Sequence, residues 1–71
     1  MADTIRVELN GKERDLRAGL TVSDLLDTLD LEPGLVVVER NREILARARY
    51  HEVVVREGDR LELVHFVGGG A

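Results

Sequence analysis

IRVELNGKERDL, at residues 5–16, is the segment from which the fold can best be predicted. Its first half alternates apolar with charged residues, which is the period of a half-buried strand. Asn10 and Gly11 in its middle form the strongest short signal for a hairpin, because a type I′ turn needs a positive φ at both positions. The register is self-consistent, since it places apolar side chains on one face. It pairs Leu9 with Lys12, Val7 with Arg14 and Ile5 with Leu16.

The segment after the hairpin predicts one amphipathic helix. Thr21 fits the N-cap and Asp24 stands three residues on, as in a capping box, with Asp in place of the preferred Glu. We expect Pro33 and Gly34 to end the segment. Between these signals the apolar residues recur at i, i+3, i+4 and i+7, which gives one stripe facing a core. They are Val22, Leu25, Leu26 and Leu29.

The second half of the chain predicts three more strands. Residues 35–39, LVVVE, begin with four consecutive apolar residues, which indicates a strand buried on both faces or nearly so. Residues 41–42 are expected to turn it back into a short strand around residues 43–45. Residues 46–55 predict a crossing loop with a short helical turn.

The last strand is predicted at residues 60–67, after a turn at residues 57–59, with Leu61 and Leu63 facing inward. The whole order is a hairpin, a helix and then these strands. It predicts an α+β fold of the β-grasp type, with a mixed sheet of four to five strands and one main helix across one face. The first and last strands are expected to lie parallel at the centre of the sheet.

Composition restricts the class of protein. The 71 residues include no cysteine, so we expect one small domain held together by packing, without disulfides, thiolate metal sites or a cysteine nucleophile. The net charge of −4 argues against binding nucleic acid and suits docking to a more basic protein. No apolar run is long enough to span a membrane and the first residues do not form a signal peptide, so a cytoplasmic protein is expected.

Few side chains offer chemistry of their own. His51 and His65 have no Ser, Cys or carboxylate cluster near them in the sequence. We therefore interpret them as ordinary residues and predict no catalytic and no metal-binding side chain. Asp24, Asp27 and Asp30 recur every three positions, as on a solvated helix face.

The chemistry is instead expected at the glycine-rich end, residues 66–71, FVGGGA. Three consecutive glycines give wide backbone freedom and no side-chain bulk, so a terminal carboxylate there could enter a narrow active site of another protein. An inert tail is the alternative, because chain ends are where order is weakest. We divide the chain into a domain at residues 1–67 and a tail at residues 68–71.

Val64 and Phe66 form a second candidate site immediately before the tail. If Leu61 and Leu63 face the core, the alternation of a strand directs these two residues the other way, where they would form a small docking patch for a partner. The alternative is that Phe66 folds back onto the edge of the sheet.

The order of these features resembles the sulfur carriers of thiamine biosynthesis, which are ubiquitin-like β-grasp proteins. The resemblance rests on the Asn-Gly hairpin, on TVSDLL at residues 21–26, and on EGDRLELV at residues 57–64 before the glycines. It implies a protein that is no enzyme and binds no cofactor. A ubiquitin-activating-type adenylyltransferase would use ATP to adenylate the terminal glycine, and a cysteine desulfurase or other sulfur donor would convert it to a thiocarboxylate. Thiazole synthase would then take the sulfur.

The end of this chain departs from the family pattern, which closes on two glycines. Here Gly68, Gly69 and Gly70 are followed by Ala71. The resemblance therefore implies that a peptidase removes Ala71 and leaves Gly70 as the acceptor. Trimming back to Gly69, and an Ala71 foreign to the natural sequence, stay open.

Other functions remain compatible with the same residues. A sulfur carrier could serve molybdopterin, cysteine or another sulfur-containing metabolite, because the tail chemistry is the same. A ubiquitin-like modifier would be joined to other proteins through its C-terminus. A β-grasp interaction module with an inert tail is the third possibility.

Overall fold

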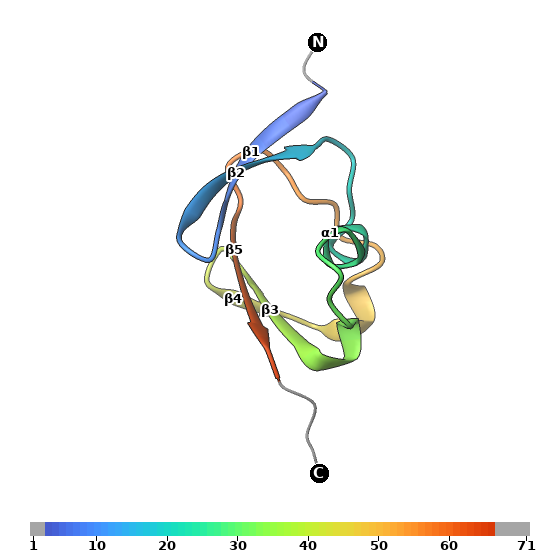
Figure 1. Ribbon diagram of the computed structural model, residues 1–71. Helices are drawn as coiled ribbons and strands as arrows, with labels where there is room; N and C mark the ends of the chain where they lie inside the picture. The colour runs from blue at the N-terminus through green and yellow to red at the C-terminus, as the bar shows by residue number, and fades with distance from the viewer. Residues whose placement is uncertain (1–2, 67–71) are drawn as a thin grey trace.

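The computed structural model describes residues 3–66, which form a five-stranded mixed sheet with one main helix across one face (Figure 1). Two short 3-10 helices, η1 (Pro33–Leu35) and η2 (Arg47–Arg49), lie in the connections. The strand order β2-β1-β5-β3-β4 confirms the predicted α+β fold of the β-grasp type. The main elements are β1 (Thr4–Leu9), β2 (Lys12–Arg17), α1 (Val22–Thr28), β3 (Val36–Arg40), β4 (Glu43–Leu45) and β5 (Arg60–His65).

The opening hairpin has the predicted register. Asn10 and Gly11 both take positive φ angles, 50° and 83°, as the type I′ turn requires. The pairs are Leu9 with Lys12, Val7 with Arg14 and Ile5 with Leu16. A local turn signal thus places the whole of β2 correctly.

β5 lies at the centre of the sheet, between the hairpin and β3 (Figure 1). It runs parallel to β1, with Leu61 opposite Leu9. It runs antiparallel to β3, with Leu63 opposite Val38. The first and last strands are therefore neighbours and parallel, as predicted.

The predicted cap and stripe of α1 are confirmed. The N–H of Asp24 donates to Oγ1 of Thr21, and the N–H of Thr21 donates to the Asp24 carboxylate, both at 3.0 Å. Asp therefore completes a capping box in place of Glu. The stripe packs against the sheet: Leu29 is partly buried, and the fully buried members are Val22, Leu25 and Leu26.

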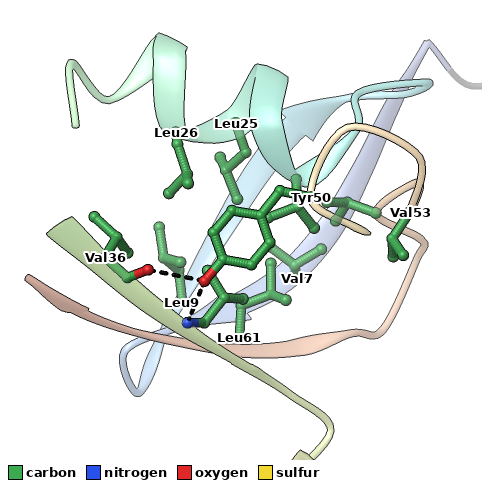
Figure 2. Packing of buried hydrophobic residues seen from close by; sticks show 11 residues of the cluster. Val7, Leu9, Leu25, Leu26, Val36, Tyr50, Val53 and Leu61 are labelled. Carbon is green, nitrogen blue, oxygen red and sulfur yellow. Dashed lines mark hydrogen bonds between the residues drawn. The ribbon is translucent and has the colours of Figure 1, made fainter. Parts of the chain in front are cut away.

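The loop after β4 contains the predicted short helical turn, η2, and also a core residue that the sequence analysis missed. Tyr50 is buried between α1 and the sheet (Figure 2). Its hydroxyl donates to the carbonyl of Val36 at 2.8 Å and accepts from the N–H of Val38 at 3.2 Å. The loop is thereby tied to β3 by a side chain that is both apolar and hydrogen-bonded.

The helix ends earlier than predicted. α1 stops at Thr28, and Asp30 takes a left-handed φ of 60°. The N–H groups of Asp30 and Leu31 donate to carbonyls of the last helical turn, which is the Schellman arrangement. Glycine usually takes the left-handed position, so an Asp there hides the end of the helix from sequence analysis. Residues 33–34 begin η1 instead.

β3 is fully buried on one face and only partly buried on the other, which falls short of the predicted burial on both faces or nearly so. Val36 and Val38 are fully buried, whereas Val37 is partly exposed. The reason is that α1 and the loop of residues 46–59 lie on the same side of the sheet (Figure 1). Alternate residues of β3 therefore face away from the core. β5 ends at His65, and Val67 lies outside the described residues.

Candidate functional site

β5 brings the two predicted docking residues to the surface. Leu61 is fully buried and Leu63 partly buried, so the alternation along the strand turns Val64 away from the core. The side chains of Val64 and Phe66 are each 53% exposed. The role of the pair in docking a partner, and the alternative that Phe66 folds back onto the edge of the sheet, both stay predictions.

The backbone of Phe66 is held in place although its ring is exposed. Its N–H donates to the carbonyl of Leu35, at the end of η1, at 2.8 Å. The backbone at the end of the described chain is thus tied to η1, just before β3 begins. The predicted tail residues Gly68, Gly69, Gly70 and Ala71 lie outside the described residues.

The face of the sheet that α1 does not cover, called the open face below, has a shallow hollow beside Val64. Val37 lies directly opposite Val64 on β3. Asn10 closes one side, and its Oδ1 accepts the N–H of Leu63 at 2.8 Å, which ties the hairpin turn to β5. Two acidic residues complete the lining, which consists of Asn10, Val37, Glu39, Glu62 and Val64. The hollow thus combines two apolar residues, Val37 and Val64, with two acidic ones, Glu39 and Glu62, and it is not an enclosed pocket.

Asp59 is a buried acidic residue just before β5, and sequence analysis placed it only in a turn. Its carboxylate accepts the N–H of Arg56 at 2.9 Å, Nε of Arg40 at 3.0 Å and Nδ2 of Asn41 at 3.2 Å. Burial acts to raise the pKa of Asp59, but these hydrogen bonds and the Arg40 charge outweigh it and hold the pKa below its ordinary value. All its contacts are internal, so it stabilises the turn that starts β5.

The remaining candidates lie apart from the open-face hollow. His51 and His65 are exposed, as are Asp27 and Asp30, while Asp24 serves the helix cap. Within residues 3–66, no group of three or more His, Asp or Glu side chains could hold a metal ion. No helix in this part of the chain is long and apolar enough to cross a membrane.

The comparisons with known proteins agree with this geometry. The model of the ThiS family matches residues 7–70. The sulfur carrier protein ThiS of Bacillus subtilis is 48% identical over 65 residues, which cover 90% of this chain and 98% of that protein. A crystal structure of the thiamine biosynthesis protein ThiS from Geobacter metallireducens superposes with a TM-score of 0.78 at 33% identity, covering 93% of this chain and all of that one.

A different class of relative is much longer. A thiazole synthase of Paramagnetospirillum magneticum is 43% identical over 67 residues, which cover 94% of this chain. The same residues make up 21% of that protein, so the chain spans about one fifth of its length.

Proposed function

The chain belongs to the ThiS family, and we propose that it is a sulfur carrier protein of thiamine biosynthesis. The observation that carries the proposal is the extent of the family match, which runs to residue 70 and includes all three glycines of the tail. In this role the protein is a reactant rather than an enzyme, and its partners supply the catalysis.

The reaction takes place at the main-chain carboxylate of the tail. A ubiquitin-activating-type adenylyltransferase transfers AMP from ATP to this carboxylate with loss of pyrophosphate, so that AMP becomes the leaving group. The persulfide of a cysteine desulfurase, or another sulfur donor, displaces AMP. A thiol then cleaves the acyl disulfide and leaves a thiocarboxylate.

Thiazole synthase is the proposed acceptor of the sulfur. Two relatives with that name contain a region similar to this chain, which occupies 21% and 20% of their length. A carrier-like region within the same polypeptide is expected if the carrier and the synthase act on each other.

The surface just before the tail suits presentation to such enzymes. The backbone of Phe66 is held against η1, while Val64 and Phe66 offer exposed apolar surface. The four residues 67–70, which end at the acceptor proposed below, span at most about 14 Å when extended, at about 3.4 Å per residue. An enzyme that holds this patch must therefore have its active site within that reach.

Gly70 is the proposed acceptor, after a peptidase has removed Ala71. The alanine methyl group would otherwise have to enter a site that accepts glycine in the related carriers. Intact mass of the protein taken from cells tests this step. A mature form that keeps Ala71 and carries sulfur would contradict it, and a form ending at Gly69 would move the acceptor by one residue.

The function is tested by incubating the protein with the adenylyltransferase, ATP and a sulfur donor, followed by intact mass spectrometry. We expect a mass gain equal to the exchange of one oxygen for sulfur at the C-terminus. The matched variant is Gly69→Val, which should fold normally but gain no sulfur, because a β-branched side chain widens and stiffens the tail.

Three results would contradict the proposal. The first is a wild-type chain that gains no sulfur from enzymes that load another ThiS carrier. Lysine-linked conjugates in cell extracts would instead favour a ubiquitin-like modifier. Full activity after deletion of the three glycines would favour an interaction module with an inert tail.

A further inference from the structure

The charges on the open face of the sheet are mostly paired. On the β1–β2 side, Arg6 contacts Asp15 at 3.1 Å and Glu13 at 3.6 Å. Between β1 and β5, Arg60 contacts Glu8 at 3.3 Å, and these two residues are direct cross-strand partners. Each carboxylate in this part of the face therefore has an arginine within 3.6 Å.

Glu39 and Glu62 break this pattern. They are direct cross-strand partners on β3 and β5, so their acidic side chains project from the same face of the sheet. Neither has an ion pair or a side-chain hydrogen bond with any other residue in the range 3–66. Like charges directly opposite each other destabilise a sheet. The pair therefore weakens the isolated domain, and a contact with another molecule would explain why both residues are present.

The surroundings of the pair suit a basic side chain. Both carboxylates line the hollow whose other walls are Val37, Val64 and Asn10. Lys and Arg side chains combine an apolar stem with a charged head, and they lay the stem along apolar surface while the head meets carboxylates. The two valines would contact the apolar stem, and the two glutamates would form ion pairs with the charged head.

We propose that Glu39 and Glu62 receive a Lys or Arg side chain of thiazole synthase when the carrier docks, with its stem against Val37 and Val64. This inference rests on the proposed function and specifies the chemistry of its docking surface. A second copy of the chain is the weaker candidate for this place, since the net charge is −4 and two open faces would bring acidic residues together.

Neutral and reversed charges test the proposal. Binding of purified thiazole synthase to wild type, to Glu39→Gln/Glu62→Gln and to Glu39→Lys/Glu62→Lys is measured by titration at low and high salt. We expect the reversed variant to bind about tenfold or more weakly at low salt, with a smaller difference at high salt, because salt screens exposed charges. The neutral variant should fall between them.

The matched control is Glu43→Gln on β4, an exposed residue whose alternation places it on the opposite side from Ile44. It removes one negative charge outside the hollow, so it should bind like wild type. The neutral double variant should also melt at a higher temperature than wild type, since the repulsion is gone. A lower melting temperature would show that the carboxylates serve the fold and would overturn the proposal.

The other outcomes separate this inference from the function itself. If wild type is loaded with sulfur and binds the synthase, but both double variants bind equally well, the docking proposal alone is wrong. It is also wrong if the variants change only binding to the adenylyltransferase, or only self-association in sedimentation. A wild-type chain that takes up no sulfur and binds no synthase contradicts both proposals.

Discussion

The two ends of β5 differ in burial and in the contacts that hold them. At the start, Leu61 is fully buried, and the neighbouring Asp59 is 6% exposed and accepts three hydrogen bonds. At the end, Val64 and Phe66 are each more than half exposed. One strand thus anchors the domain at one end and presents apolar surface at the other. Stability and docking should therefore be separable by mutations only a few residues apart.

The largest effect is expected at the buried end. Leu61→Ala should lower the free energy of unfolding by about 2–5 kcal/mol, because it leaves a cavity between α1 and the sheet. Urea denaturation measures the change. The matched variant on the same strand is Val64→Ala, which should cost less than about 1 kcal/mol. Equal losses at the two positions would contradict the comparison.

Asp59 should produce the next largest effect, and one that depends on pH. Asp59→Asn should cost about 1–3 kcal/mol near neutral pH, since it removes an ionised acceptor from a buried network. The pKa of Asp59 is lowered in the folded state, so the unfolded state binds the proton first as the pH falls. The stabilisation is therefore present above about pH 4 and is lost as the pH falls through the lowered pKa.

Urea midpoints at about pH 7 and about pH 3 measure this dependence. Wild type should lose stability over the interval, and Asp59→Asn should lose less of it. The control is Asp27→Asn, which changes an exposed carboxyl on α1 and should keep the wild-type slope. An unchanged acid slope in Asp59→Asn would show that another carboxylate is responsible.

Tyr50 supports the exposed end of β5 indirectly, and its hydroxyl should have a moderate effect. The Tyr50 hydroxyl donates a hydrogen bond to the carbonyl of Val36, and Val36 is the cross-strand partner of His65. Tyr50→Phe should cost about 1–2 kcal/mol, because a buried carbonyl and a buried N–H lose a partner. Thermal unfolding measures the loss, and amide exchange at Val38 should become faster. Unchanged exchange at Val38 would contradict this account.

The smallest effect on stability is expected at the tip. Phe66→Asp should change the free energy of unfolding by less than about 0.5 kcal/mol, because the ring is more than half exposed. Binding to the adenylyltransferase or thiazole synthase should nevertheless be lost, whereas Phe66→Leu should retain most of it. A folding defect in Phe66→Asp would mean that the ring stabilises the sheet edge.

The prediction from sequence was correct where the signal is local. The Asn10-Gly11 turn predicts the register of the first two strands, and Thr21 with Asp24 predicts the start of the helix, because all these contacts lie within a few residues of one another. It failed at Asp30, where a residue other than glycine takes the left-handed position. It also failed at Tyr50, since a single aromatic residue in an irregular loop has no periodicity to mark it as core.

The candidate site, too, was predicted where its signal is local and missed where it depends on distant residues. The alternation along the last strand correctly predicted that Val64 and Phe66 are exposed, and the glycines that follow are visible in the sequence. The opposition of Glu39 and Glu62 was not predictable, because it depends on the register between β3 and β5. Asp59 was assigned to a turn, but its burial depends on residues 18 and 19 positions away in the chain.

The amino-acid sequence alone predicts the order of the elements, the core-facing residues of α1 and of the last strand, and the glycine tail that follows that strand. These follow from periodicity and turn chemistry, which act over a few residues. The charges that meet across strands and the polar groups that are buried in the core depend instead on the tertiary fold. Such contacts join distant segments, so their geometry exists only after the parallel pairing of β1 with β5 and the antiparallel pairing of β5 with β3 have brought those segments together.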